Sequence, residues 1–297
     1  MFRGALTALV TPFRDGRVDD DALVRLVEAQ IQGGIDGLVP CGTTGESPCL
    51  SYAEHIHVIE VVMRAAAGRV PVLAGAGSNC TREAIELSRA CKELGVAGTL
   101  QITPYYNKPT QEGLIAHFTQ IADAVGLPVV LYNVPGRTGV DLLPETLATL
   151  CKHPLVVGVK EATGDMIRAS RVRELCGPDF ILLSGDDFTL LPLLAVGGDG
   201  VISVGSNVVP DKFAAMCRAA KAGRWDEARA IHYDLLPLSR ALFSVSSPIP
   251  VKHAMAMLGR IGPEMRAPLV ALGDDRPELA LLRRELAALG LQGELQR

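Results

Sequence analysis

The sequence predicts an α/β protein, a (β/α)8 barrel of the TIM type with a C-terminal helical extension. Short apolar runs rich in β-branched residues alternate with longer stretches of helical periodicity along most of the 297 residues. The apolar runs lack the alternation of a half-exposed sheet, which is typical of parallel strands buried on both faces. Eight such units fit the size of this barrel, about 250 residues.

Eight strands are expected in the first 204 residues. The first run could be mistaken for the apolar part of a signal peptide, but Pro12 and a charged segment follow it without a small-residue cleavage pattern. The expected strands are Ala5–Val10, Gly37–Pro40, Val70–Ala74, Gly98–Ile102, Pro128–Asn133, Leu155–Lys160, Phe180–Ser184 and Gly200–Val204.

Helices are expected between the strands, with Asp20 and Thr81 as caps and Pro210 opening the last helix of the barrel. We place the catalytic barrel at residues 1–223 and a C-terminal helical domain at residues 224–297. The expected helices are Asp20–Gln32, Ala53–Ala67, Thr81–Leu94, Gln111–Val125, Pro144–Cys151, Met166–Cys176 and Pro210–Ala222, then Trp225–Phe243, Pro250–Leu258 and Pro277–Leu289 in the extension.

A doubly wound sheet is the competing architecture. Its best cue is G-A-G-S-N-C at residues 75–80, between a strand and a helix. The third glycine of a dinucleotide fingerprint is missing, and no acidic residue ends the next strand to bind a ribose. The barrel is therefore the preferred prediction.

Composition excludes several classes of function. The net charge of −4 and the lack of a Lys/Arg-rich block argue against nucleic-acid binding. The sequence contains no run of 18 apolar residues, so no membrane span is predicted. The cysteines are odd in number, scattered and without a C-x-x-C pair, which indicates a reducing cytoplasm rather than a disulfide framework. No metal site is expected: there is no H-E-x-x-H motif, and His55 and His57 fall on different faces of one helix.

Polar residues gather after the strands. The segments are C-G-T-T-G-E-S (41–47), G-A-G-S-N (75–79), T-P-Y-Y-N-K-P (103–109), Y-N-V-P-G-R-T-G (132–139), K-E-A-T-G (160–164), S-G-D-D (184–187) and S-V-G-S-N (203–207). The carboxyl ends of barrel strands share one mouth, where the chemistry of these folds takes place. The opposite loops are plain turn sequences, so the asymmetry itself predicts a functional site.

Lys160 ends an apolar strand and would lie inside the barrel. Poor solvation lowers the pKa of an amine, and a neutral amine can condense with a carbonyl to form a Schiff base. Lys160 could instead pair with Glu161 or another acid and only seal the barrel. Tyr132, on the preceding strand, could relay protons, and Arg137 could bind a carboxylate. Each also has an ordinary interpretation, as a core-edge tyrosine and a solvated arginine.

The motifs together resemble the dihydrodipicolinate synthase family of pyruvate-dependent class I aldolases, to which N-acetylneuraminate lyase is related. The resemblance covers almost the whole chain. It is carried by A-L-V-T-P-F, G-T-T-G-E-S, T-P-Y-Y-N-K-P, L-Y-N-V-P-G-R-T-G, G-V-K-E-A-T-G, L-S-G-D-D, G-V-I-S-V and P-I-P-V-K.

The resemblance implies a lyase that condenses pyruvate with L-aspartate 4-semialdehyde in lysine (diaminopimelate) biosynthesis, without metal or cofactor. It implies a homo-oligomer, a tetramer built as a dimer of dimers. Lys160 would form the imine, and Thr43, Tyr132 and Tyr106 would relay protons, with Tyr106 supplied by a neighbouring subunit. Thr43 and Thr44 would hold the pyruvate carboxylate, Arg137 the carboxylate of the aldehyde, and Gly185 and Ile202 would place backbone carbonyls near Lys160.

The resemblance also implies an effector site for L-lysine at Ser47, His55, Asn79, Glu83 and Tyr105. Three positions depart from the family pattern. Tyr52 stands where histidine is common, Gly136 stands where serine is common, and Ser246–Ser247 precede P-I-P-V-K, where we expect them to be remote from the mouth.

Two other functions stay open at this point. One is an imine-forming lyase or dehydratase acting on a 2-keto sugar acid; Arg137 within N-V-P-x-R favours the synthase over it. The other is a catalytically silent barrel that binds a small acid, against which the intact lysine, tyrosines and arginine argue.

Overall fold

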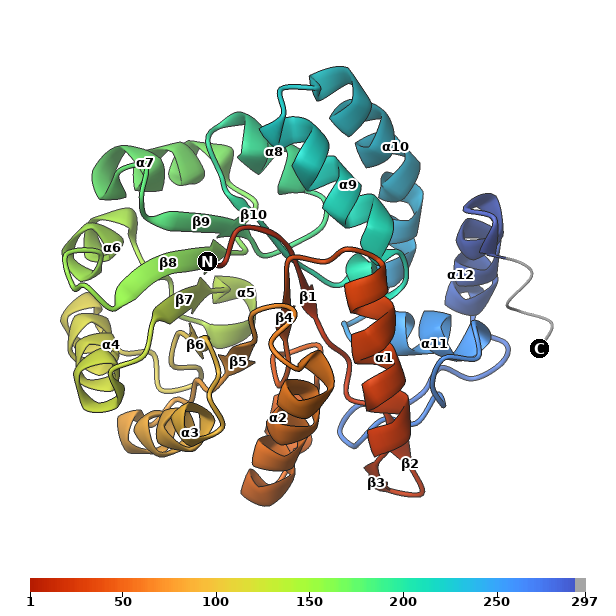
Figure 1. The fold of residues 1–297 in the computed structure, drawn as a ribbon, viewed down its shortest axis with the longest axis horizontal. Helices are drawn as coiled ribbons and strands as arrows, with labels where there is room; N and C mark the ends of the chain where they lie inside the picture. The colour runs from red at the N-terminus through yellow and green to blue at the C-terminus, as the bar shows by residue number, and fades with distance from the viewer. Residues whose placement is uncertain (292–297) are drawn as a thin grey trace.

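A computed structural model describes residues 1–291 of the chain, and in this part a parallel eight-stranded sheet forms the centre of the molecule (Figure 1). Its strands are β1 Gly4–Ala8, β4 Gly37–Val39, β5 Leu73–Gly75, β6 Gly98–Ile102, β7 Val129–Asn133, β8 Val156–Glu161, β9 Ile181–Ser184 and β10 Gly200–Ser203. A short antiparallel hairpin, β2 Phe13–Arg14 and β3 Arg17–Val18, follows β1. All eight predicted strands are present, with ends shifted by a few residues.

The sheet closes on itself into a barrel. Its strand order runs β4-β1-β10-β9-β8-β7-β6-β5, and a parallel bridge joins Leu38 to Val72 across the gap between β4 and β5. Two backbone bonds reinforce the closure: Leu38 N donates to Pro71 O at 3.0 Å, and Gly75 N donates to Pro40 O at 2.9 Å. The predicted barrel is confirmed, and a doubly wound sheet with two open edges does not describe the chain.

Helices cover the outside of the barrel (Figure 1). Their bounds are α1 Asp20–Gln32, α2 Tyr52–Ala66, α3 Thr81–Glu93, α4 Gln111–Val125, α5 Pro135–Thr138, α6 Pro144–Leu150, α7 Met166–Cys176, α8 Leu190–Ala195 and α9 Pro210–Lys221, with 3-10 turns η1 Ser47–Cys49 and η2 Gly205–Asn207. We did not predict α5 or α8. Both are too short for a helical period to show, and α8 reads L-L-P-L-L-A, without a polar face.

Two of the predicted helix caps are off by one position. Asp19, not Asp20, caps α1, because its side chain accepts a hydrogen bond from Ala22 N at 3.0 Å. Cys80 precedes α3, and the hydroxyl of Thr81 instead forms a 2.8 Å hydrogen bond with His117 Nδ1. Pro210 opens α9, as predicted.

The C-terminal extension consists of α10 Trp225–Leu242, α11 Ile249–Met257 and α12 Pro277–Ala288. Buried residues of this extension, including Leu235 and Leu282, belong to the same apolar cluster as Val27 and Val201 of the barrel. A division near residue 223 falls in the turn between α9 and α10. We keep separate domains at 1–223 and 224–297 as a proposal; residues 292–297 lie outside the described part.

A second apolar cluster fills the interior of the barrel. It includes Leu6, Val39, Leu100, Val130 and Ile202, one from each of five strands. This cluster surrounds the strand ends where the polar segments begin. Within residues 1–291, no helix is both long and apolar enough to cross a bilayer.

Candidate active site

Lys160 lies near the carboxyl end of β8, inside the barrel. In the register of the sheet it is flanked by Tyr132 of β7 and Leu183 of β9. Only 6% of its surface is exposed, and its Nζ lies 4.3 Å from the centroid of the Tyr132 ring. The prediction that Lys160 lies inside the barrel, at the end of an apolar strand, is confirmed.

Burial lowers the pKa of Lys160 to about 8. The ammonium loses hydration inside the barrel, so the neutral amine is favoured. The negative charge of Asp187 opposes this shift, and the positive charge of Arg137 adds to it. About a tenth of the amine is therefore neutral at pH 7, and this is the form that attacks a carbonyl.

Glu161 is not the partner of Lys160. The neighbouring side chain points the other way, where its carboxylate accepts hydrogen bonds from Arg168 Nε at 3.0 Å and Thr163 N at 2.8 Å. No carboxylate in residues 1–291 forms an ion pair with the Lys160 amine. This removes the alternative in which Lys160 merely seals the barrel with its neighbour.

The hydroxyl of Tyr132 faces the same space. Burial raises its pKa, while the charge of Arg137 and a hydrogen bond with the Thr43 side chain lower it. A buried phenol bonded to a hydroxyl can receive and return a proton without bulk water. Two of the three predicted relay residues thus lie together beside Lys160.

Tyr106 lies outside this cluster within the single chain. Its side chain is 89% exposed, and its backbone has a left-handed φ of +74°. Its N–H donates to Thr138 O at 3.2 Å, which holds the segment against α5. The Tyr106 side chain is thus not part of the Lys160 cluster within this chain, and its role in the relay stays a prediction.

Arg137 lies at the rim of the mouth, on the one-turn helix α5. Its Nη2 donates to Ser247 O at 3.4 Å. The prediction that Ser246–Ser247 are remote from the mouth is therefore wrong. The segment between α10 and α11 reaches the rim at Arg137, and Ser247 is buried there. Its hydroxyl has no hydrogen-bond partner among residues 1–291.

The loop of residues 41–46 presents Thr43 and Thr44. Gly45 N donates to Gly42 O at 3.1 Å, and Cys41 and Glu46 both adopt left-handed φ angles of 55°. Gly75 permits the loop to approach β5, because a Cβ there would lie 2.2 Å from Cys41 O. The backbone N–H groups and hydroxyls of such a compact loop can receive a carboxylate.

Gly185 follows β9 and Ile202 lies in β10, the two strands after β8 in the barrel. Gly185 comes directly after β9, and its N–H donates to Glu161 O at 2.7 Å. A Cβ at Gly185 would lie 2.4 Å from Ala162 Cβ, so only glycine fits this close approach. Ile202 is buried in β10. Their roles toward Lys160 stay predictions.

Asp187 is a site residue for which the sequence suggested no role. It is buried, its Oδ2 accepts a hydrogen bond from Gly205 N at 2.8 Å, and its charge acts on Lys160. Burial raises its pKa to about 6, against hydrogen bonds from Ser203 and Gly205. The D-D pair after the seventh predicted strand was the available signal, but its spacing does not say which acid turns inward.

A network on the outer side of the strand ends was also missed. Arg168 bonds to Glu161 at 3.0 Å and to Asp141 at 2.9 Å, and Asn133 donates to both acids, at 3.2 and 2.9 Å. It joins the ends of β7 and β8, the two strands that carry Tyr132 and Lys160. Such a fully bonded network limits movement of these strands.

A cavity of about 410 Å³ is lined by Arg137 and by Thr43, whose side chain bonds to Tyr132. Four of the five predicted effector residues line the same cavity: Ser47, His55, Glu83 and Tyr105. The fifth, Asn79, is not among its lining residues but donates from Nδ2 to Tyr105 O at 3.1 Å. Tyr52 also lines the cavity.

Some polar groups of the cavity are already bonded. His55 is buried and its Nε2 lies 2.7 Å from Gly75 O, whereas His57 turns outward to Asp20 at 2.8 Å. The two histidines thus point apart, as predicted. Glu83 accepts a hydrogen bond from Ser78 at 2.8 Å. No group of three or more His, Cys, Asp or Glu side chains in residues 1–291 is arranged to hold a metal ion.

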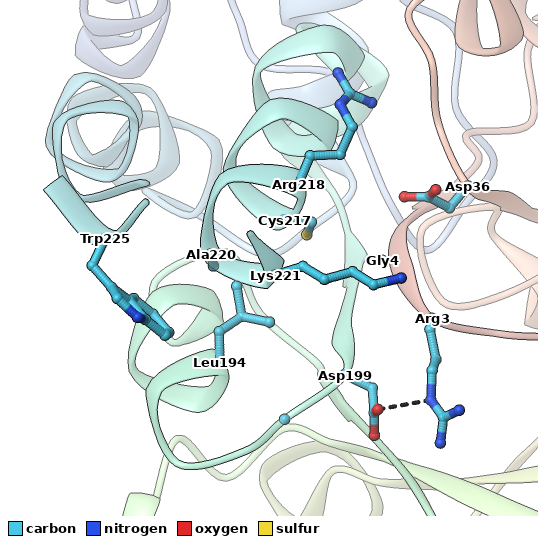
Figure 2. A pocket seen from close by; sticks show the side chains of 11 residues that line it. Arg3, Gly4, Asp36, Leu194, Asp199, Cys217, Arg218, Ala220, Lys221 and Trp225 are labelled. Atoms are coloured by element: carbon cyan, nitrogen blue, oxygen red, sulfur yellow. Dashed lines mark hydrogen bonds and ion pairs between the residues drawn. The ribbon is translucent and has the colours of Figure 1, made fainter. Parts of the chain in front are cut away.

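A different pocket, of about 280 Å³, lies at the opposite end of the barrel (Figure 2). It adjoins the start of β1 at Gly4, and Asp36 and Asp199 directly precede β4 and β10. Asp199 pairs with Arg3 at 2.7 Å and with Arg173 at 2.8 Å. In barrels of this type the end opposite the carboxyl ends of the strands serves stability rather than chemistry, so the candidate active site is the cluster of Lys160, Tyr132 and Thr43 at the mouth.

Comparisons with known proteins point to one family. The Dihydrodipicolinate synthetase family matches residues 1–282. A 4-hydroxy-tetrahydrodipicolinate synthase from Nitratidesulfovibrio vulgaris (strain DP4) is 59% identical over 98% of this chain and 99% of its own length. The solved dihydrodipicolinate synthase from Acinetobacter baumannii, in complex with pyruvate, superposes with a TM-score of 0.95 at 43% identity, over 98% of this chain and 100% of that one. The enzyme from Cyanidioschyzon merolae, with lysine bound, gives a TM-score of 0.94 at 42% identity, over 98% and 99%.

Proposed function

Because the chain belongs to the dihydrodipicolinate synthetase family, we propose that its barrel mouth condenses pyruvate with L-aspartate 4-semialdehyde through an imine on Lys160. The chain is a lyase with 4-hydroxy-tetrahydrodipicolinate synthase activity, an enzyme of lysine and diaminopimelate biosynthesis. Pyruvate is bound by the solved A. baumannii enzyme. The aldehyde and the roles of individual residues are the proposal.

The first step is attack of the neutral Lys160 amine on the keto carbon of pyruvate. The carbinolamine loses water once its hydroxyl is protonated, which leaves a protonated imine. Tyr132 and Thr43 are placed to pass the protons between the amine and the carbinolamine oxygen, since they bond to each other beside Lys160. Tyr106 of a neighbouring subunit would complete the relay. The pyruvate carboxylate would lie against the Thr43–Thr44 loop.

The second step forms the carbon–carbon bond. The protonated imine withdraws electrons, so the pyruvate methyl group loses a proton and the resulting enamine attacks the aldehyde carbon. Arg137 at the rim would bind the carboxylate of the aldehyde substrate with its two-pronged donor set. A substrate without that carboxylate would leave the guanidinium unpaired, which is a basis for discrimination. Gly185 and Ile202 would orient the amine through their carbonyls.

The observation that carries this mechanism is the buried Lys160 amine stacked on Tyr132, with a pKa near 8. Borohydride reduction in the presence of pyruvate tests it. We expect a reduced pyruvate adduct on the peptide that contains Lys160. An unmodified Lys160 in active enzyme would refute the assignment of Lys160 as the nucleophile.

Substrate choice needs a parallel assay. Pyruvate with L-aspartate 4-semialdehyde should turn over, whereas sialic acid and keto-deoxy-gluconate should not. Turnover of the sugar acids alone would replace the proposed aldehyde with a sugar acid. No adduct and no turnover would point instead to a barrel that only binds a small acid.

Regulation and assembly form the rest of the proposal. L-lysine would bind in the cavity lined by Ser47, His55, Glu83 and Tyr105, with Asn79 behind Tyr105. The lysine bound in the C. merolae enzyme and the continuity of this cavity with Thr43 and Arg137 support it. The enzyme would act in the cytoplasm as a tetramer, a dimer of dimers. A steady-state assay with and without lysine tests the first point, and sedimentation the second.

A further inference from the structure

Lys252 is a charged residue that the proposed mechanism does not use. It lies in α11 of the C-terminal extension, and its side chain has no exposed surface. Its Nζ lies 2.5 Å from Glu46 Oε1 and 2.9 Å from Thr11 O, over the Phe13 ring. The bond to Glu46 spans 206 residues of sequence and joins the extension to the mouth of the barrel.

Glu46 belongs to the loop that presents Thr43 and Thr44. Its backbone N–H donates to Thr43 O at 3.1 Å. Its left-handed φ is uncommon for a residue with a side chain, so the surroundings must hold it in place. The carboxylate supplies that hold: Oε1 meets Lys252, and Oε2 accepts a hydrogen bond from Arg266 N at 3.0 Å.

Other contacts fasten the same segment. Thr11 Oγ1 donates to Gly45 O at 2.7 Å, and the Thr11 carbonyl is the second acceptor of Lys252. Arg266 Nη1 donates to Cys49 O at 3.0 Å, at the other end of the segment. The back of the loop is thus fixed by the extension, while its front faces the cavity through Thr43.

Stability alone does not explain this pair. Removing two charges from water is costly, and well-packed apolar residues of similar volume often stabilise a fold as well or better. An apolar pair, however, would form no directional bond between α11 and the loop of residues 41–46. It therefore would not specify where the loop lies. Burial lowers the pKa of Lys252, and the charge of the bonded Glu46 opposes that shift.

We propose that Lys252 is a positioning residue, which acts through Glu46 to fix the loop of Thr43 and Thr44 against the bound keto acid. This deepens the proposed function and rests on it. The extension then acts in catalysis as well as in the core, since it sets the geometry of pyruvate capture.

The test is the double variant Lys252→Met, Glu46→Gln, which removes both charges without leaving either unpaired. We expect a folded enzyme whose KM for pyruvate rises by roughly ten- to a hundredfold, because small misplacements of binding groups have effects of this size. The rate of borohydride-trapped imine formation at low pyruvate should fall by the same factor. The KM for L-aspartate 4-semialdehyde should change by less than about twofold.

The matched control is Arg173→Met, Asp199→Asn, which removes a half-buried ion pair at the opposite end of the barrel. It should leave the KM for pyruvate unchanged even if it lowers the melting temperature. If the first double variant does not fold, Glu46→Gln alone receives the same measurements, because its amide oxygen can accept from only one of the two donors and the hold on the loop is still weakened.

Three outcomes would overturn the proposal. One is a folded double variant with an unchanged KM for pyruvate. The second is an equal rise of KM for both substrates, and the third is an equal effect of the control pair; both would indicate a structural role only. Failure of the wild-type enzyme to trap pyruvate on Lys160 would instead refute the proposed function, which the trapping experiment detects separately.

Discussion

The charged form of Lys160 destabilises the fold, whereas its neutral form is the reactive one. Its pKa is lowered by burial from 10.5 to about 8, so the folded chain releases a proton that the unfolded chain keeps between these two values. Its contribution to stability therefore rises with pH across that window, and below about pH 8 the full penalty is present.

Lys160→Met should remove this penalty. We expect the free energy of unfolding near pH 7 to rise by roughly 1–3 kcal/mol, since one pKa unit corresponds to about 1.4 kcal/mol. Catalysis should be lost at the same time. Urea unfolding, with circular dichroism as the signal, measures the first effect. A variant less stable than the wild type would show that contacts of the Lys160 amine stabilise the fold by more than its desolvation costs.

Asp187 tunes the same amine. Its charge raises the pKa of Lys160 against the effect of burial. Asp187→Asn keeps an oxygen for the Gly205 N–H but removes the charge. The pKa of Lys160 should fall further, so the pH at which trapping by borohydride reaches half its maximum should move to lower pH.

The matched control for that shift is Asp226→Asn, at an exposed carboxylate in the first turn of α10, which should leave the profile unchanged. A profile that does not move in Asp187→Asn, or moves to higher pH, would contradict the assigned electrostatics.

Among the secondary-structure elements near the mouth, two glycines differ in whether the structure has room for a larger residue. Gly75 ends β5 beneath the Thr43 loop, and a Cβ there would lie 2.2 Å from Cys41 O. Gly75→Ala must displace a loop backbone, so we expect a loss of about 1–3 kcal/mol in stability and a raised KM for pyruvate. Thermal unfolding and steady-state kinetics measure the two effects.

Gly136 in α5 is the contrasting case. A Cβ there meets no atom within 4 Å. Gly136→Ala should be tolerated and raise stability by up to about 1 kcal/mol, because glycine is a poor helix former. Its effect on the KM for L-aspartate 4-semialdehyde shows whether α5 must flex to place Arg137. Destabilisation by Gly136→Ala would show that α5 requires glycine.

At the scale of the whole molecule, Tyr106 links the active site to assembly. Its phenol is 89% exposed in the single chain. If it serves a neighbouring subunit, hybrids of Lys160→Ala and Tyr106→Phe should contain sites with both wild-type residues. Mixing the two inactive variants under conditions that exchange subunits should restore part of the activity.

Activity of such mixtures no greater than the sum of the two parent variants would place Tyr106 in the site of its own chain or outside catalysis. A mixture of Lys160→Ala with Tyr132→Phe is the control. Both residues lie in one chain, so exchange rebuilds no complete pair within it. Recovery in the first mixture alone therefore reports on Tyr106.

Local sequence patterns were enough for the strands, most helices and the position of Lys160. The adjacency of Tyr132 and Lys160 followed as well, because consecutive strands of a parallel barrel lie side by side. Helix α8 was missed because a short apolar run has no period, and the caps of α1 and α3 were misplaced by one residue because neighbouring polar residues compete for the same role.

Three features can be read from the order of residues alone: the alternation of strand and helix, the gathering of polar residues at one end of the barrel, and the chemistry open to a buried lysine beside a tyrosine. Only the tertiary structure decided that Ser247 reaches Arg137, that Asp187 turns toward Lys160, and that Lys252 holds Glu46. The physical reason is range. Hydrogen-bonded periodicity acts over a few residues and leaves a visible pattern, whereas a contact between residues 110 or 206 positions apart depends on the path of the whole chain.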